Sequence, residues 1–365
     1  MSIAISPTFV PRGLACLGNA LRRRAMLGQA LVLFAAAMMA TAPLAAAQTG
    51  EPREVVVSVP GPGLSLSMPL ELAVKTGADR AEGIALRLNF TGGGGVALRD
   101  VQTGNAGFAV LGLPAVMDLH LKDPRIVALA AIDDVALFTL MVRSDLRGKV
   151  RSVQDLKGRT IGIFANTLAT KVTSQQFAEL LLLGHGVALD TVRLTAAGGN
   201  WETQSAMFAS RSLDACVVDG AVAERLATQK IAFQLFSSGN PSDAKRLAGA
   251  GFLRGVLIGR RDRVDADPVA AERMVKTVKR TLEWMASRSP EQIADALGLP
   301  AGDERAALIA TLRKYPRQFS RDGKFSAAQM RETEVFYRAN TPDNPEAQRL
   351  SVETLIVDRW AGRKP

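Results

Sequence analysis

A short stretch that begins at Ser152 constrains the fold more than any other part of the chain. Ser152 and Asp155 have the spacing of a capping box, in which two side chains satisfy free N–H groups at the start of a helical turn. Gly158 suits the left-handed residue that ends such a turn. The apolar run 160–164 predicts a buried strand, and the small polar residues 165–169 predict a loop that leads into a helix. Open α/β folds bind ligands where a strand ends in such a loop, so this stretch predicts one wall of a cleft.

The same alternation of strand and helix recurs along most of the chain. Apolar or alternating runs between glycine- and proline-rich turns predict strands, and a segment with helical spacing follows most of them. The predicted strands are Val55–Val59, Ile84–Phe90, Ala106–Leu111, Ile126–Ile132, Ala136–Val142, Thr160–Phe164, Thr191–Ala196, Asp214–Val218, Ile231–Phe236 and Phe252–Ile258. Strands that alternate with helices form parallel βαβ units, so the predicted fold class is α/β. Beyond the last strand the spacing is helical.

The length and an internal repeat indicate two lobes. A chain of 365 residues is too long for one ordinary core. Glycine-rich loop, helix, strand and turn follow one another in residues 92–114 and again in 198–222, which fits either two similar lobes or a chance likeness between βαβ units. No low-complexity linker divides the chain, so the lobes are expected to be joined by crossing strands. We expect residues 48–144 and 250–365 to form the first lobe, with the C-terminal helices, and 145–249 the second.

The first 47 residues have the layout of a secretory signal peptide. Three arginines at 22–24 precede an apolar run at 25–42, and Ala45-Ala46-Ala47 offers a cleavage site. The apolar run is long enough for an uncleaved anchor, but its small residues and the cleavage site favour export. The paired arginines also fit a twin-arginine signal, although a plain basic region explains them as well. The mature protein is therefore expected in the periplasm.

Charge and chemistry exclude several functions. The signal carries four arginines and no acids, so its removal lowers the net charge from +10 to +6, and the remaining basic residues are scattered, which disfavours nucleic-acid binding. Cys16 leaves with the signal, and Cys216 lies in an apolar strand, which favours a structural thiol over a nucleophile. His120 and His185 have no neighbours at metal-ligand spacing. No hydrolase, nucleotide or metalloprotease motif occurs, so we expect neither an enzyme nor a cofactor.

Glycine loops and strand ends supply the candidate binding residues. Gly92–Gly95 follows a strand and precedes a helix, so its N–H groups suit an anion or polar ligand, unless the loop is only a surface turn. Trp201 ends a second glycine loop and suits a ligand face, or simply anchors its helix. Asn166 and Asp219 fall at the ends of predicted strands, where cleft polar groups belong, although either also suits a helix cap.

Several motifs resemble one family. The segment Asp155–Ile163 resembles the D-L-K-G-K-x-I-G-V signature of ABC-transporter substrate-binding proteins, in the branch for nitrate, sulfonates, taurine and thiamine-precursor pyrimidines. The helix Met68–Gly77, the loop Gly92–Gly95 and the strand Asp214–Asp219 are similar in order and spacing. The resemblance covers roughly residues 55–337. The branch usually has a Gly-x-x-Asp pair before one strand of each half, and here each copy keeps only half of that pair.

The resemblance implies a two-lobed periplasmic-binding-protein fold of type II, with parallel-rich sheets flanked by helices. It implies a monomer without cofactor that captures a small solute between its lobes and delivers it to a separate membrane permease and ATPase. Backbone N–H groups at Gly93, Gly94 and Thr167 could bind an anionic group of the solute. Trp201 could pack on an apolar part of it, and Asp219 could accept a hydrogen bond from an amine or form a contact between the lobes. The candidate cleft residues are Ser65, Gly93, Gly94, Leu113, Asn166, Thr167, Thr170, Trp201 and Asp219.

Three alternatives remain at this point. A receptor of a tripartite, ion-driven transporter has a similar fold but a partner without an ATPase. A related pyrimidine synthase uses a histidine and a cysteine-rich motif that this sequence lacks. A sensor subunit would present its ligand to a signalling receptor. Sulfonate, nitrate, aromatic-acid and pyrimidine receptors share this scaffold, so the sequence leaves the solute open.

Overall fold

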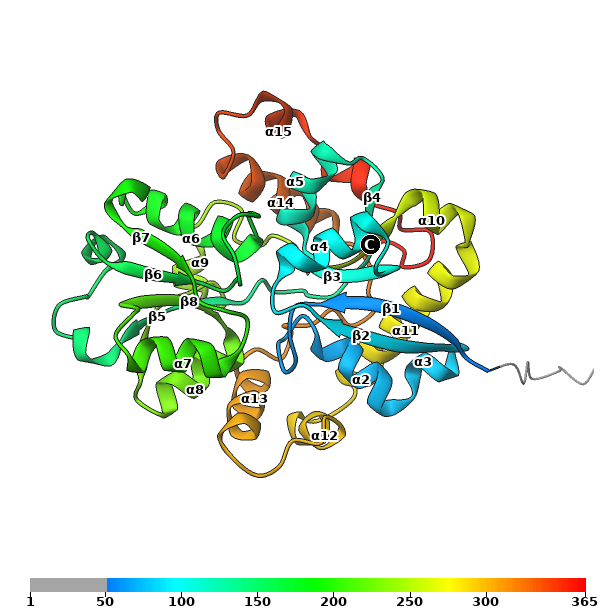
Figure 1. Cartoon of the computed structure of the whole chain (residues 1–365), viewed down its shortest axis with the longest axis horizontal. Coiled ribbons are helices and arrows are strands. Elements are labelled where there is room, and N and C mark those ends of the chain that lie inside the picture. The colour runs from blue at the N-terminus through cyan, green and yellow to red at the C-terminus, as the bar shows by residue number, and fades with distance from the viewer. Residues whose placement is uncertain (1–50) are drawn as a thin grey trace, which may run out of the picture. The chain divides into compact units, whose positions relative to one another are not determined.

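The computed structural model describes residues 51–365, so the predicted signal peptide lies outside the described residues. Residues 52–365 form one compact unit that contains two five-stranded sheets. Figure 1 shows the sheets side by side, each flanked by helices. Each sheet is the centre of its own lobe, as the sequence predicts.

The first lobe has strand order β2-β1-β3-β10-β4. Its strands are β1 (Arg53–Val59), β2 (Ile84–Phe90), β3 (Phe108–Gly112), β4 (Ile126–Ala131) and β10 (Gly255–Arg260). Its helices are α2 (Met68–Thr76), α3 (Ala78–Ala81), α4 (Gly94–Thr103), α5 (Leu113–Lys122), α10 (Arg261–Ala266) and α11 (Pro268–Ala286). Every residue of β4 is buried, which explains its uninterrupted apolar sequence.

The second lobe has strand order β7-β6-β8-β5-β9. Its strands are β5 (Phe138–Arg143), β6 (Thr160–Ile163), β7 (Arg193–Ala196), β8 (Ala215–Asp219) and β9 (Ala232–Ser237). Its helices are α6 (Thr173–Gly184), α7 (Trp201–Ala209), α8 (Gly220–Thr228) and α9 (Pro241–Ala244), with short 3₁₀ turns at Ser144–Leu146, Val153–Leu156 and Leu189–Thr191. The turn at Val153–Leu156 has the predicted capping box of Ser152 and Asp155.

The chain crosses between the lobes twice. It passes from β4 to β5 and returns from β9 to β10, and each arriving strand pairs antiparallel with both of its neighbours. The parallel pairs are β1 with β2 and β3, and β6 with β7 and β8. The sheets are therefore mixed rather than built from βαβ units alone. The lobe boundary predicted at residue 144 is wrong by one strand, because β5 pairs in the second sheet.

The C-terminal helices touch both lobes. They are α12 (Pro290–Ala296), α13 (Asp303–Lys314), α14 (Ala327–Ala339) and α15 (Pro345–Arg349), followed by a 3₁₀ turn at Val352–Leu355. Helix α12 packs on α2 of the first lobe, whereas α13 packs on α8 of the second. Phe336 of α14 stacks on Phe252 with ring centroids 4.1 Å apart. The predicted assignment of all these helices to the first lobe is therefore too simple.

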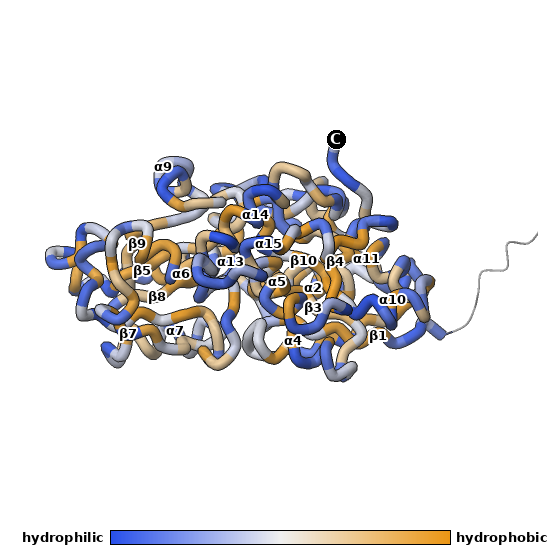
Figure 2. Tube along the Cα trace, turned by 90° about the horizontal axis from the view of Figure 1, so that it is seen from above, coloured by the Kyte–Doolittle hydropathy of each residue, from blue (hydrophilic) through white to orange (hydrophobic). Residues whose placement is uncertain are grey.

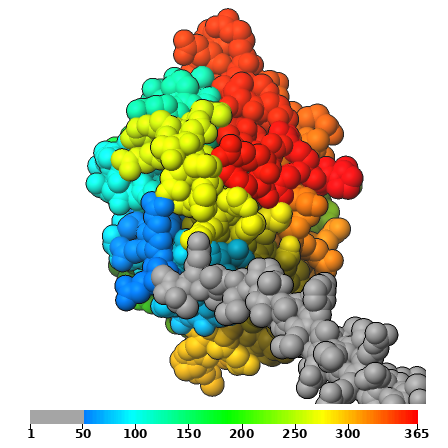
Figure 3. Space-filling model, turned by 90° about the vertical axis from the view of Figure 1, so that its right-hand side faces the viewer, coloured from blue at the N-terminus to red at the C-terminus, as the bar shows by residue number. Residues whose placement is uncertain are grey.

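The core of each lobe lies on its sheet. Figure 2 shows apolar residues concentrated along the strands and hydrophilic residues on the outer helices and turns. The last residues of the chain cover the edge of the first sheet, where Val357 N–H donates to the Ala128 carbonyl at 2.9 Å. Figure 3 shows this C-terminal segment, in red, beside the yellow segment that includes α10. An edge strand covered in this way cannot pair with another chain.

A capping side chain begins several helices, among them α11, α12 and α14, and one of these caps gives a direct test. Ser289 Oγ accepts from the Gln292 N–H, and Gln292 Oε1 accepts from the Ser289 N–H at 3.0 Å. We expect Ser289→Ala to lower the free energy of unfolding by about 1 kcal/mol in urea titrations. Ser287→Ala, which removes only a hydroxyl bonded to the Trp284 carbonyl, is the control and should change it by less than about 0.5 kcal/mol. Equal losses would contradict the capping argument.

Candidate functional site

A small cavity lies between the lobes, where strands of both sheets end. It has a volume of about 40 Å³. Segments after β1, β2, β3, β6 and β8 form its walls, and Phe138 and Arg254, where the two crossing segments arrive, form its floor. Its lining comprises Pro60, Leu64, Leu66, Gly94, Leu98, Leu111, Gly112, Ala115, Phe138, Phe164, Val172, Thr173, Ser174, Asp219 and Arg254. This is the position at which open α/β sheets bind ligands.

Arg254 is the centre of the cavity floor. It directly precedes β10, and only 1% of its side chain is exposed. Its Nε donates to Asp133 Oδ2 at 2.6 Å, its Nη1 to the Leu137 carbonyl at 2.9 Å, and its Nη2 to Ser65 Oγ at 2.5 Å. The guanidinium also lies 5.3 Å from the centre of the Phe138 ring. Arg254 thus ties both crossing segments to the loop after β1.

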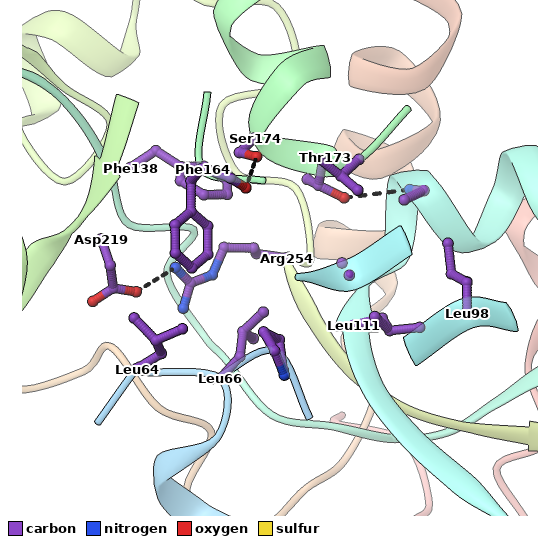
Figure 4. A pocket seen from close by; sticks show the side chains of 15 residues that line it. Leu64, Leu66, Leu98, Leu111, Phe138, Phe164, Thr173, Ser174, Asp219 and Arg254 are labelled. Atoms are coloured by element: carbon purple, nitrogen blue, oxygen red, sulfur yellow. Dashed lines mark hydrogen bonds and ion pairs between the residues drawn. The ribbon is translucent and has the colours of Figure 1, made fainter. Parts of the chain in front are cut away.

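Asp219 joins the second lobe to this floor. The Ser65 hydroxyl donates to Asp219 Oδ2, and Arg254 Nη1 reaches the same oxygen at 3.4 Å. The other carboxylate oxygen accepts from the Ala221 N–H at the start of α8, also at 3.4 Å. Figure 4 shows Asp219 and Arg254 facing one another beneath Phe138. Ser65 and Asp219 therefore form a hydrogen bond from one lobe to the other.

Burial and the neighbouring charges shift the pKa values of Asp133 and Arg254 in the cavity floor. Burial raises the pKa of Asp133 to about 6, although Arg254 acts in the opposite direction. Burial lowers the pKa of Arg254, but Asp133 and Asp219 more than offset that effect, so the guanidinium stays charged. Asp133 Oδ1 is buried and has no hydrogen-bond partner among the described residues. With a pKa of about 6, Asp133 is mainly ionised at pH 7.5.

The remaining walls are mostly apolar. Leu64, Leu66, Leu98 and Leu111 lie around the cavity in Figure 4, together with the two phenylalanines. Two hydroxyls at the start of α6 are already engaged: Ser174 Oγ donates to the Phe164 carbonyl at 2.8 Å, and Thr173 Oγ1 accepts from the Ala115 N–H at 3.3 Å. The second of these contacts is another hydrogen bond between lobes.

The structure brings together part of the predicted site. Gly94 and Asp219 line the cavity, and Ser65 bonds to Asp219. Leu113 is fully buried behind the lining, and its N–H donates to the Arg254 carbonyl at 2.8 Å. Thr167 lies in a local turn, in which its Oγ1 accepts from the Ala169 N–H.

Three predicted residues lie at contacts between the lobes. The Gly93 Cα faces the Asn166 backbone so closely that an added Cβ would lie 3.3 Å from its nitrogen. Gly95 likewise faces Thr170, at 3.1 Å from an added Cβ. The first glycine loop therefore packs on the loop after β6, and helix α6 begins beyond that loop, at Thr173.

Trp201 faces a different cavity. This second cavity, of about 310 Å³, lies between α2, α7, α8 and α13, and its lining also includes Glu71, Arg225 and Glu304. The Arg225 guanidinium lies 4.0 Å above the Trp201 ring. The structure thus separates Trp201 from Asp219, with which the sequence had grouped it.

Sequence reasoning missed Arg254, Asp133 and Phe138. One signal was available, because Arg254 is the one charged residue in the apolar run 252–258. A charge in a buried run needs a partner, and Asp133 directly follows another such run. The pairing itself spans 121 residues of sequence and has no local signature.

The model of the NMT1/THI5-like family matches residues 67–293, which is more than half of the chain. The chain belongs to this family. No curated protein matches it.

Solved structures show the same fold. A Bordetella bronchiseptica protein has a TM-score of 0.76 at 22% identity, over 85% of this chain and 96% of its own. The alkanesulfonate-binding protein SsuA of Xanthomonas axonopodis pv. citri, bound to MOPS, has a TM-score of 0.63 at 17% identity, over 85% and 99%. The periplasmic nitrate-binding protein NrtA of Synechocystis PCC 6803 has a TM-score of 0.64 at 11% identity, over 84% and 86%. At these identities the likeness establishes the periplasmic-binding-protein fold alone, which the sequence predicted.

Within residues 51–365, the potential metal ligands are dispersed and both histidines are engaged in local hydrogen bonds. No group of three or more potential metal ligands lies together there. His120 and His185 each bond through Nδ1 to a backbone carbonyl, that of Ile126 and that of Leu181. Over the same residues, no helix combines the length and the apolar character needed to span a bilayer.

Cys216 gives a test of the structural role of the thiol. Its side chain is fully buried in β8, and burial raises the pKa of the thiol. We expect the folded mature protein to resist dithiobis(nitrobenzoate) and the protein in guanidinium chloride to react with one equivalent. Rapid labelling of the folded protein would contradict the inert role.

Proposed function

We propose that the chain is the periplasmic solute-binding receptor of an ABC importer, which captures a small organic molecule or an oxyanion and delivers it to a permease. One observation carries the proposal: the cavity lies at the ends of strands from both lobes, and both crossing segments meet beneath it. Two proteins of similar fold, an alkanesulfonate-binding protein and a periplasmic nitrate-binding protein, support it. We infer binding without chemical change of the solute.

The mechanism is a shift between open and closed lobes. A cavity of about 40 Å³ has room for about one water molecule, so a solute enters only when the lobes part. Rotation about the crossing segments breaks the Ser65–Asp219 hydrogen bond and exposes the cavity walls. A solute that contacts both walls favours the closed form, which the permease recognises.

We assign the cleft to Ser65, Gly94, Asp219 and the newly found Arg254. The first two belong to the first lobe, Asp219 belongs to the second, and Arg254 lies between them on a crossing segment. The contact between the two loops, which stabilises the closed form, is assigned to Gly93, Asn166 and Thr170. Leu113 and Thr167 support the walls, and Trp201 belongs to the second cavity.

Native mass spectrometry of the mature protein, purified from the periplasm without refolding, tests the proposal. We expect a small molecule to co-purify and to be released on unfolding. Adding that molecule at about 100 times its dissociation constant should stabilise the fold by roughly 2.7 kcal/mol. The proposal fails if no solute from broad panels of anions, amines and neutral metabolites changes either the melting temperature or the radius of gyration.

The nearest alternative is a receptor of a tripartite, ion-driven transporter. Reconstitution separates the two, because only an ABC importer couples the receptor to ATP hydrolysis. We expect the loaded receptor, added as a monomer to proteoliposomes that contain its permease and ATPase, to stimulate hydrolysis. Solute uptake that needs an ion gradient and no ATP would favour the alternative.

A further inference from the structure

The charges beneath the cavity do not balance. Three side chains of ionisable residues lie there: Arg254 and Asp133, each 1% exposed, and Asp219, 5% exposed. One guanidinium faces two carboxylates, which leaves one negative charge in excess. Arg254 is the only basic residue among the described residues that line the cavity.

The excess charge resides on Asp219. Arg254 Nε lies 2.6 Å from Asp133, whereas its Nη1 lies 3.4 Å from Asp219 and also serves the Leu137 carbonyl. The guanidinium is therefore committed mainly to Asp133. Asp219 otherwise receives one hydroxyl proton from Ser65 and a long bond from the Ala221 N–H. A buried carboxylate with only such partners is costly unless a further positive group approaches it.

Asp219 also borders apolar walls. Leu64 lies directly beside it in Figure 4, and Phe138 and Phe164 lie above Arg254. Such walls favour a hydrocarbon or aromatic body, and they keep water from screening the carboxylate. A second anion in the same space would face Asp219 without a free cation to neutralise it.

We infer that the solute of this cleft is an organic cation: an ammonium or amidinium group that binds Asp219, attached to an apolar body that packs on the leucine and phenylalanine walls. The inference rests on the proposed function of the cleft and narrows it. The cationic group supplies the positive charge that the side chains Arg254, Asp133 and Asp219 together lack. A sulfonate or nitrate is then a poor solute for this chain, in contrast to the sulfonate and nitrate receptors of similar fold.

Two ligands that share one apolar group but carry opposite charges test this inference. Benzylammonium and phenylmethanesulfonate share the benzyl group and differ in the sign of their charge. In calorimetric titrations of the mature protein at pH 7.5, the dissociation constant of benzylammonium should be at least tenfold lower than that of phenylmethanesulfonate. Asp219→Asn should weaken the binding of benzylammonium at least tenfold, because asparagine preserves the shape and removes the excess charge, and a cooperative melting transition should show that the unliganded variant is folded.

A matched variant controls for net charge. Asp190→Asn makes the same change on the exposed surface of the same lobe and should leave benzylammonium affinity unchanged. The inference is overturned if phenylmethanesulfonate binds as tightly as benzylammonium, if neither binds, or if Asp219→Asn leaves the affinity for benzylammonium intact. Sulfonate binding that reduces the radius of gyration would overturn the inference while supporting the receptor, whereas the absence of closure with every panel solute overturns the receptor itself.

Discussion

Replacing Gly199 by alanine will prevent full closure of the lobes. Gly199 lies in the loop after β7, and a Cβ there would lie 2.5 Å from the carbonyl oxygen of Gly92 in the other lobe. The obstacle is backbone, held at a positive φ of 70° at Gly92, so no side chain can rotate away. Overpacking of this kind costs about 1–3 kcal/mol, and the apparent affinity falls by the same free energy because the closed form binds the solute.

Scattering and titration measure this effect. We expect the co-purifying solute to bind Gly199→Ala about tenfold or more weakly, since 1.4 kcal/mol is a factor of ten. The radius of gyration with solute should stay near that of the open protein. Gly148→Ala is the control in the same lobe, because no atom lies within 4 Å of its added Cβ. Wild-type affinity and compaction in Gly199→Ala would show that these loops do not meet in the bound form.

A second contact offers a rescue. An added Cβ at Gly112 would lie 2.0 Å from Thr173 Oγ1 and 2.6 Å from Thr173 Cβ, across the lobes. Gly112→Ala should therefore also lower the affinity for the solute. The double variant with Thr173→Gly should recover part of the lost affinity, because it removes the side chain that the new Cβ would contact. Failure of the rescue would point to local distortion of β3 rather than to blocked closure.

Local sequence patterns predicted the elements well. All ten predicted strands occur, with bounds that differ by at most three residues, because short β-branched runs between glycine turns have few other solutions. The predicted pairing of Ser152 with Asp155 also forms, since a capping box depends only on residues three apart. These features are decided within a few residues of chain.

Pairing between distant segments could not be predicted in the same way. The run 136–142 is equally apolar whether it joins the first sheet or the second, so the lobe of β5 depends on contacts with β8 and β9. The position of Trp201 at the start of α7 does not say which cavity its ring faces. The candidate site was therefore half predicted: Asp219 and Gly94 follow from strand ends, whereas Arg254 needs the tertiary structure.

Replacing Arg254 by leucine will destabilise the protein more than any surface substitution. The leucine fills part of the space but leaves Asp133 buried without its cation and the Leu137 carbonyl without its donor. Breaking one side of a buried ion pair costs about 3–5 kcal/mol, which urea titration at pH 7.5 measures as the free energy of unfolding. Arg260→Leu, at the end of β10, is the control. It removes an ion pair with the exposed Asp262 and a hydrogen bond to the Gln102 carbonyl, and it should cost about 1 kcal/mol.

The pH dependence distinguishes this electrostatic cause from lost packing. Burial already holds the pKa of Asp133 at about 6 in the folded protein, above its ordinary value of 3.8, and loss of Arg254 raises it further. A raised folded pKa means that the folded state binds the proton more tightly than the unfolded state, so this group's contribution to stability falls as pH rises through that window. Arg254→Leu should therefore lose less stability at pH 5 than at pH 7.5, and adding Asp133→Asn should recover part of the loss at pH 7.5. A loss of equal size at both pH values, with no recovery in the double variant, would attribute it to packing around Phe138 instead.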